Sequence, residues 1–152
     1  MVFSIALRIT GDRPAAEEVA QDVFLGLYRH LGDIESPEHA TAWLRKVAVQ
    51  RAIDAARHAS RLPRADMEAN DLPDTPGNGD ALLARHLERL IAELPEQMRA
   101  VIVLRYQEEL MPSEIARILA MPVATVKSNL QRGLQLLRQQ TERTLGKTHG
   151  RS

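Results

Sequence analysis

The last part of the chain carries side chains whose types and spacing suit nucleic-acid binding. Residues 111–152 include seven basic and two acidic residues, a net charge of +5. Four long polar side chains recur there at spacings of four, four and three, which places them on one side of a helix. Lysine and arginine bind phosphates or guanine edges, and glutamine can bond base edges in the major groove. The pattern predicts a helix whose polar side binds DNA, and this side consists of Lys127, Gln131, Gln135 and Arg138.

The same helix has an apolar side that would pack against its own domain and leave the polar side exposed. We expect the helix to cover residues 122–145, and a shorter helix to cover residues 112–119 before it. Two helices of this kind joined by a short turn are typical of a helix-turn-helix. The alternative is an ordinary amphipathic helix with a solvated basic side. The apolar side consists of Val126, Leu130, Leu134 and Leu137.

Two further helices are predicted in the first half of the chain. Asp12 before Arg13-Pro14 and Ser36 before Pro37 are N-cap signals, because a short polar side chain can accept a bond from the first turn. The first of these helices should end at Gly32, and the second should end near Ser60. The first should also have one apolar, core-facing side made of Val19, Val23, Phe24, Leu27, Tyr28 and Leu31.

The region between the two halves loses helical periodicity. Residues 65–84 contain five acids and no base, and residues 73–79 concentrate proline and glycine. Helical spacing of leucines resumes at Leu82, and Pro95 then breaks the register and begins another helix. The expected fold is therefore all-α, with two small helical domains joined by a flexible linker and a helix-turn-helix in the second. The expected boundaries are a domain at 1–62, an acidic linker at 63–80, a domain at 81–146 and a tail at 147–152.

The composition excludes several classes of function. The chain has no cysteine, so a disulfide framework, a zinc-thiolate site and a thiol nucleophile are excluded. No metal-ligand spacing of histidines, carboxylate pair or nucleophile–base set stands out, so we expect no enzyme, cofactor or metal. No apolar run approaches the roughly 20 residues that span a bilayer. The apolar start is too short for a signal peptide, so the expected location is cytoplasmic, without membrane insertion.

Several motifs in the second half resemble region four of the extracytoplasmic-function (ECF) family of bacterial RNA polymerase sigma factors. They are Leu94-Pro95-Glu96-Gln97-Met98-Arg99, Leu104-Arg105-Tyr106, Glu114-Ile115-Ala116, Val123-Ala124-Thr125-Val126-Lys127-Ser128, Arg132-Gly133 and Leu137-Arg138. In that family this domain binds the upstream promoter element and the β-flap of the polymerase. The resemblance implies upstream-element contacts by Thr125, Lys127, Ser128, Gln131 and Arg132.

The first half resembles region two of the same family, and the two matches together cover nearly the whole chain. The motifs are Thr10-Gly11-Asp12, Ala16-Glu17-Glu18-Val19, Gln21-Asp22-Val23-Phe24, Ala42-Trp43-Leu44 and Ile53-Asp54. The resemblance implies docking on the polymerase β′ clamp helices by Glu18, Gln21, Asp22 and Leu25. It implies recognition of the downstream promoter element by Arg45, Lys46, Gln50, Arg51, Arg57 and Arg61.

Simpler interpretations of single residues stay open beside these roles. Glu17 and Glu18 also suit the positive end of a helix dipole, and Trp43 also suits a core anchor. The acidic linker could follow the RNA-exit path, as in the family, or be a solvated spacer. The resemblance further implies an anti-sigma factor as a partner, beside core RNA polymerase and promoter DNA.

The sequence also departs from the family pattern. Many members have another turn or more before the segment that starts at Phe3, so we expect either that the start is assigned late or that the first domain is trimmed at its N-terminus. Gln50 stands where asparagine is frequent, which puts the base preference in doubt. Ala120 and Ala124 stand where glycine is common, and Asn129 replaces a frequent arginine. These departures predict weaker DNA affinity or altered specificity.

Two other classes of protein share parts of the pattern. A stand-alone helix-turn-helix regulator would bind an operator as a dimer without polymerase. A helical adaptor would sequester another protein and not touch DNA. Substituting Lys127 and Arg132 with alanine should leave such an adaptor active, whereas it should abolish promoter-specific transcription by a sigma factor.

Overall fold

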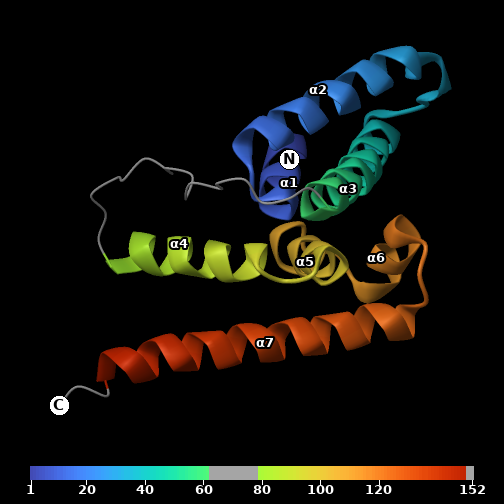
Figure 1. The fold of residues 1–152 in the computed structure, drawn as a ribbon. Coiled ribbons are helices and arrows are strands. Elements are labelled where there is room, and N and C mark those ends of the chain that lie inside the picture. Colours follow the sequence, from blue (N-terminus) through green and yellow to red (C-terminus); the bar gives the residue numbers. More distant parts are fainter. Residues whose placement is uncertain (62–78, 150–152) are drawn as a thin grey trace. The chain divides into compact units, whose positions relative to one another are not determined.

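The computed structural model of the chain describes residues 1–61 and 79–149, which form seven α-helices with no strand among them (Figure 1). The chain divides into two compact units, Met1–Gly77 and Asn78–Ser152. The predicted all-α class is confirmed. Most of the predicted acidic linker lies outside the described residues. None of the described helices is long and apolar enough to cross a membrane.

The first unit is a bundle in which each of three α-helices contacts the other two. Its elements are α1 (Val2–Thr10), α2 (Arg13–Arg29), the 3-10 turn η1 (Leu31–Asp33) and α3 (Pro37–Arg61). Figure 1 shows α2 and α3 side by side, with α1 against them. The core consists mainly of small and branched side chains: Val2, Ile5, Ala6, Ile9, Ala16, Val19, Val23, Ala48, Val49, Ala52, Ile53 and Ala56.

Both predicted N-caps are present in the first unit. The Asp12 carboxylate accepts a hydrogen bond from the backbone N–H of Ala15 at 3.1 Å, and α2 begins at the next residue, Arg13. The Ser36 hydroxyl accepts one from the N–H of His39 at 3.1 Å, and α3 begins at Pro37. The caps satisfy N–H groups that have no partner within the helix.

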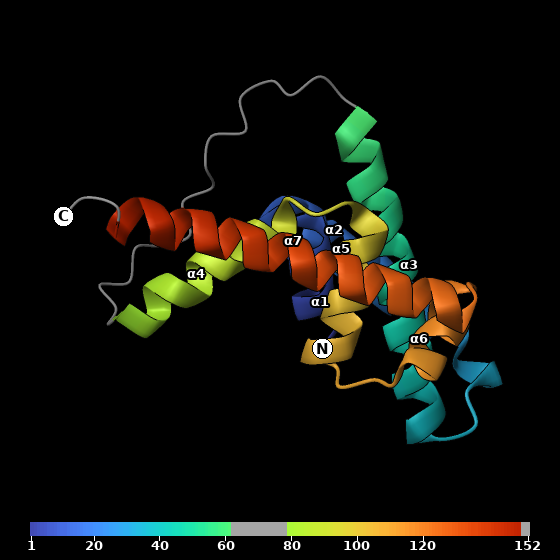
Figure 2. The ribbon, with the colours of Figure 1, turned by 90° about the horizontal axis from the view of Figure 1, so that it is seen from below.

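The second unit is arranged around its long last helix. Its elements are α4 (Gly79–Ala92), α5 (Glu96–Ile102), the π-helical turn η2 (Val103–Gln107), α6 (Pro112–Leu119) and α7 (Val123–His149). Helices α4, α5 and α6 all contact α7, and Figure 2 shows α7 crossing α5 and running beside α4. One cluster of its core consists of Leu90, Leu94, Ile102 and Leu137. The last helix extends to His149, beyond the predicted end at residue 145.

The predicted apolar side of α2 is only partly correct. Val19 and Val23 are buried, but Phe24, Tyr28 and Leu31 are exposed, by 76% in the case of Tyr28. In the C-terminal half of α2 it is Gly26 that lies against Trp43 of α3, while α1, with 9 residues against the 17 of α2, is too short to cover α2 from end to end. Sequence periodicity cannot distinguish an apolar side that meets the core from one that extends past it.

Candidate nucleic-acid interface

The segment from α6 to α7 has the geometry of a helix-turn-helix. The backbone N–H of Met111 donates to the Glu114 carboxylate at 3.1 Å and so ties down the start of α6. At its other end Ala120 adopts the left-handed conformation with φ 51°, and α7 begins three residues later at Val123. This conformation reverses the chain quickly, which brings α6 and α7 into contact.

Burial along α7 separates an inner side from an outer side. Val126 is fully buried and Leu137 is 8% exposed, while Leu130 packs partly buried against the same core. The predicted inner side is thus confirmed at these positions, whereas Leu134 is 38% exposed. All five residues predicted to contact the upstream element are exposed: Thr125, Lys127, Ser128, Gln131 and Arg132.

The electrostatics of the outer side suit an anion. Residues 123–141 of α7 contain three basic and no acidic residues. The start of a helix also presents N–H groups without a helical acceptor, together with the positive end of the helix dipole. The exposed first turns of α7 can therefore approach a phosphate without a carboxylate on the same turns that would repel it.

A second basic surface lies on α3 of the first unit. Ala48, Val49, Ala52, Ile53 and Ala56 fill its inner side. Of the residues predicted for the downstream element, Lys46, Gln50 and Arg51 are exposed, and Arg45 and Arg57 are half-buried. The backbone of Arg61 is helical, but its side chain lies outside the described residues. The structure thus brings five of the six predicted residues to the accessible surface of one helix.

The third predicted surface lies on α2 and is larger than the sequence indicated. Glu18, Gln21, Asp22 and Leu25 are all exposed. Leu25 is one of four large apolar residues in the C-terminal half of α2 and the turn after it that are each more than half exposed: Phe24, Leu25, Tyr28 and Leu31. A cluster of exposed large apolar side chains is typical of a protein-binding surface. Sequence reasoning assigned three of these four to the core.

Two family models match the chain, one for each unit. The Sigma-70 region 2 model matches residues 1–62 and the Sigma-70 region 4 model matches residues 84–137. The ECF RNA polymerase sigma factor SigL of Mycobacterium tuberculosis is 34% identical over 145 residues, which cover 91% of this chain and 81% of SigL. The chain belongs to the ECF sigma factors.

Other proteins similar to this sigma factor are sigma factors as well. The ECF sigma factor SigW of Bacillus subtilis is 29% identical over 153 residues, covering 91% of this chain and 82% of SigW. Among solved structures, the sigma factor RpoE of Bartonella quintana, crystallised with the anti-sigma factor NepR, shares the fold with a TM-score of 0.66. That likeness covers 91% of this chain and 88% of RpoE at 17% identity. The protein is therefore a sigma factor that directs promoter-specific transcription initiation.

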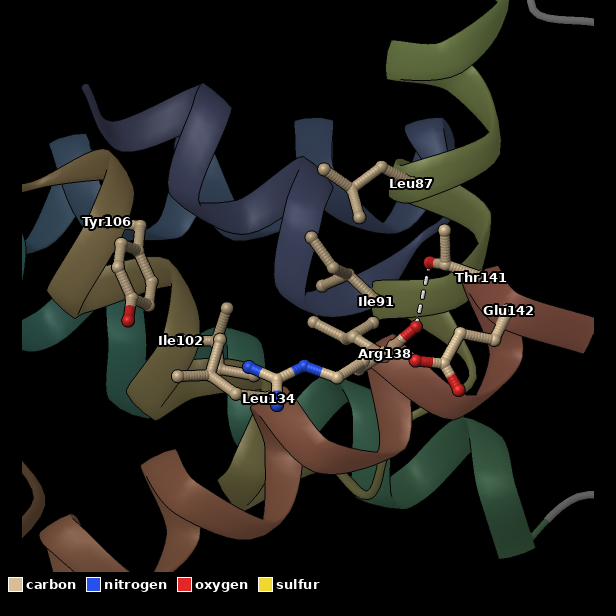
Figure 3. Close-up of a pocket in the computed structure, with 9 residues that line it drawn as sticks. Leu87, Ile91, Ile102, Tyr106, Leu134, Arg138, Thr141 and Glu142 are labelled. Atoms are coloured by element: carbon tan, nitrogen blue, oxygen red, sulfur yellow. Dashed lines mark hydrogen bonds between the residues drawn. The ribbon is translucent and has the colours of Figure 1, made fainter. Parts of the chain in front are cut away.

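The sigma factor also has an apolar groove that sequence reasoning missed. The groove has a volume of about 560 Å³ and lies within the second unit, between α4, the α5–η2 segment and α7 (Figure 3). Its apolar lining comes from all three elements. The sequence did not predict it, because helix periodicity alone does not show which exposed residues of separate helices come together. The lining residues are Leu87, Ile91, Ile102, Tyr106, Leu134, Leu137, Arg138, Thr141 and Glu142.

Arg99 holds one wall of this groove in place. Its guanidinium donates to the backbone oxygen atoms of Ala92 at 2.6 Å and Leu94 at 2.8 Å, at the end of α4. Ala92 is the last residue of α4 and Leu94 lies in the turn after it, so the arginine of α5 serves as a cap for the C-terminal end of α4. Burial lowers the pKa of Arg99, and the nearby Glu96 carboxylate acts in the opposite direction. Arg99 thus fixes α5 to the end of α4, the helix that carries Leu87 and Ile91.

Proposed function

We propose that the sigma factor recognises the upstream promoter element through the outer side of α7 and the downstream element through α3. The observation that carries the proposal is the division of α7 into a buried side with Val126 and an exposed side with Lys127 and Arg132. The upstream contacts are assigned to Thr125, Lys127, Ser128, Gln131 and Arg132. The downstream contacts are assigned to Arg45, Lys46, Gln50, Arg51, Arg57 and Arg61.

The domain assignment follows from the assignment of the two promoter elements to helices of different units. We assign residues 1–62 to a region-two domain, 63–80 to an acidic linker and 81–146 to a region-four domain, with a short tail after it. Each surface alone offers few phosphate contacts, so neither should bind DNA tightly. When both are bound to one polymerase, the effective concentration of the second contact rises. The chain thus acts by binding and not by catalysis, in the cytoplasm where polymerase and promoters meet.

Run-off transcription with core polymerase tests the role of α7. The variant Lys127→Ala/Arg132→Ala should lose at least about tenfold in yield, because each base contact contributes about 1–3 kcal/mol. Arg143→Ala is the matched control: Arg143 is also exposed on α7 but lies far from its start. Equal yields from the two variants on a promoter with an intact upstream element would contradict the proposal.

The proposed polymerase contacts are the α2 surface for the β′ clamp helices and the apolar groove of the second unit for the β-flap. The groove is supported by its size and by apolar residues that the fold leaves uncovered, such as Leu87 and Tyr106 at 43% and 56% exposure. On α2, the proposed contacts of Glu18, Gln21, Asp22 and Leu25 are adjacent to the exposed apolar cluster. A mixed surface of this kind can bury apolar area at its centre and pair charges at its rim.

Two leucines of α7 provide a matched test of the groove. Leu134 and Leu136 are 38% and 39% exposed, but only Leu134 lines the groove. Leu134→Asp should weaken binding to core polymerase at least about tenfold, since it places a charge in the apolar contact. Leu136→Asp should bind as the parent chain does. The comparison is made by native electrophoresis with purified core enzyme, and equal binding by both variants would refute the groove assignment.

We also infer an anti-sigma factor as a regulatory partner. Support comes from the shared fold with a sigma factor that was crystallised with its anti-sigma factor. A partner that covers the α2 surface or the groove would compete with polymerase for the same apolar residues. Adding a candidate anti-sigma factor should therefore lower run-off yield, and excess core polymerase should restore it. Inhibition that excess polymerase does not relieve would speak against a shared surface.

A further inference from the structure

Gly133 lies on the buried side of α7, at a point where no Cβ atom fits. A Cβ added to its backbone would stand 2.5 Å from Cδ1 of Ile102 and 3.0 Å from Cγ of Met98, both on α5. Carbon atoms of different residues pack best at about 3.5–4.0 Å. A side chain at position 133 would therefore require Ile102 and Met98 of α5 to shift.

The close contact explains an otherwise unfavourable residue. Glycine is among the least favourable residues in a helix interior, because it loses the most backbone freedom there. Gly133 is nevertheless buried in the middle of α7, between Val126 and Leu137 on the same side. The tight approach of α5 accounts for glycine at this position.

The position of Gly133 couples this contact to the outer side of α7. Successive residues of a helix are turned by about 100°, so Arg132 lies about 100° and Ser128 about 140° around the helix from Gly133, both away from the buried side. Lys127 and Gln131 are less than two turns away along the same rigid helix. A displacement of α7 at Gly133 therefore moves the proposed DNA contacts with it.

We infer that Gly133 is a positioning residue for promoter recognition. It sets the distance between α5 and α7, and thereby the depth and direction at which Lys127 and Arg132 meet the upstream element. The inference rests on the proposed role of α7, and it adds a residue that does not itself touch DNA.

Local adjustment of α5 should not absorb a side chain at position 133. Ile102 is 4% exposed and belongs to the core cluster with Leu90, Leu94 and Leu137. Its Cδ1 lies 2.5 Å from the added Cβ and would have to rotate within this packed core, while its Cγ1 at 3.4 Å is in ordinary contact. Met98 approaches through Cγ, in the middle of its side chain. An added Cβ therefore requires Met98 or α7 to move by a few tenths of an ångström.

The test compares promoter preference and not yield alone. The full-length variant Gly133→Ala is assayed with core polymerase on promoters that carry single-base changes in the upstream element, at a temperature where circular dichroism shows it folded. We expect about a tenfold loss on the best promoter, the effect of one displaced base contact, and a changed order of preference among the others. Gly79→Ala is the control, since a Cβ at Gly79 meets nothing within 4 Å.

A second substitution relieves the contact. Ile102→Val removes Cδ1, the atom nearest to the added Cβ, so Ile102→Val/Gly133→Ala should recover part of the yield. Met98 Cγ still lies 3.0 Å away, so the promoter order should stay different from that of Ile102→Val alone. If Gly133→Ala does not fold, the test is the comparison of Ile102→Val/Gly133→Ala with Ile102→Val. Identical promoter orders in these two variants would then overturn the inference.

The remaining outcomes separate this inference from the proposed function. A folded Gly133→Ala variant with unchanged yield and promoter order overturns the inference, and so does an equal loss on every promoter, which indicates a structural role only. If Lys127→Ala/Arg132→Ala is fully active, the proposed role of α7 fails. If that variant is inactive while Gly133→Ala behaves as the parent chain, only the inference about Gly133 fails.

Discussion

Helices α3 and α7 carry the same net charge on their proposed DNA-binding segments but are supported in different ways. Residues 45–58 and residues 123–138 each have a net charge of +3. In α3 the inner side consists of small and branched residues that pack against α1 and α2. In α7 the inner side meets α4, α5 and α6, and at one glycine, Gly133, α5 leaves little room for a side chain.

This difference shows that similar charge patterns need not have similar tolerance to mutation. Alanine side chains along α3 spread the close packing over several turns, from Ala48 to Ala56. In α7 the orientation of the outer side depends on fewer positions, namely the turn at Ala120 and the contact at Gly133. We therefore expect substitutions in α3 and in α7 to differ in their effects on stability and DNA binding.

The largest expected effect is a loss of stability in one unit without a loss in the other. Leu104 in the second unit and Ile9 in the first are fully buried, and truncating such residues to alanine costs about 2–5 kcal/mol. Trp43 is the only tryptophan and lies in the first unit, so its fluorescence reports unfolding of that unit alone. Ile9→Ala should shift the fluorescence transition to lower urea concentration, whereas Leu104→Ala should shift only a transition seen by circular dichroism.

The interpretation of the two units as separate folding units depends on this outcome. If Leu104→Ala shifts the Trp43 transition by as much as Ile9→Ala does, the units unfold together. The comparison of α3 with α7 would then concern one cooperative structure.

The next effect concerns the salt dependence of promoter binding. Lys46→Ala/Arg51→Ala on α3 and Lys127→Ala/Arg132→Ala on α7 each remove two exposed positive charges. If all four contact phosphates, the slope of log K against log salt should fall by about two in each variant. Filter binding of holoenzyme over a salt series measures the slope. A reduction in the α7 variant alone would remove α3 from the proposed interface.

Much of the fold was predictable because local signals decide it. The N-caps at Asp12 and Ser36 and the alternation of buried and exposed residues along α7 depend on neighbours within a few residues. The groove, the cap that Arg99 provides to α4, and the contact at Gly133 each require two helices at a known distance. Spacing along one helix contains no such distance, so these features emerged only from the structure.

The error on α2 has a related cause. Phe24, Tyr28 and Leu31 continue the helical spacing of Val19 and Val23, so the sequence assigned them to one core side. The structure shows that these three residues are exposed, while Gly26 of the same helix lies against Trp43 of α3. On α7, residue types and spacing identified the exposed polar side correctly, because charged groups rarely lose their water without a partner.

A smaller effect is expected at the N-cap of α2. Asp12→Ala removes the acceptor for the N–H of Ala15 and should lower the stability of the first unit by about 1 kcal/mol. Asp12→Asn keeps a capping oxygen and should behave nearly as the parent chain does. Urea unfolding followed by Trp43 fluorescence measures both. Equal losses in the two variants would indicate that the charge, and not the cap, stabilises this end.

The smallest effect should have opposite signs at two alanines on either side of the turn between α6 and α7. Ala120 adopts φ 51°, a left-handed conformation that glycine enters without strain, so Ala120→Gly should stabilise the second unit by about 0.5–1 kcal/mol. Ala124 lies within α7, where glycine is unfavourable, so Ala124→Gly should destabilise it by up to about 1 kcal/mol. Circular dichroism during urea unfolding measures both shifts. Shifts of the same sign would mean that the turn is not strained, and that the family's usual glycine at position 120 serves DNA approach instead of backbone geometry.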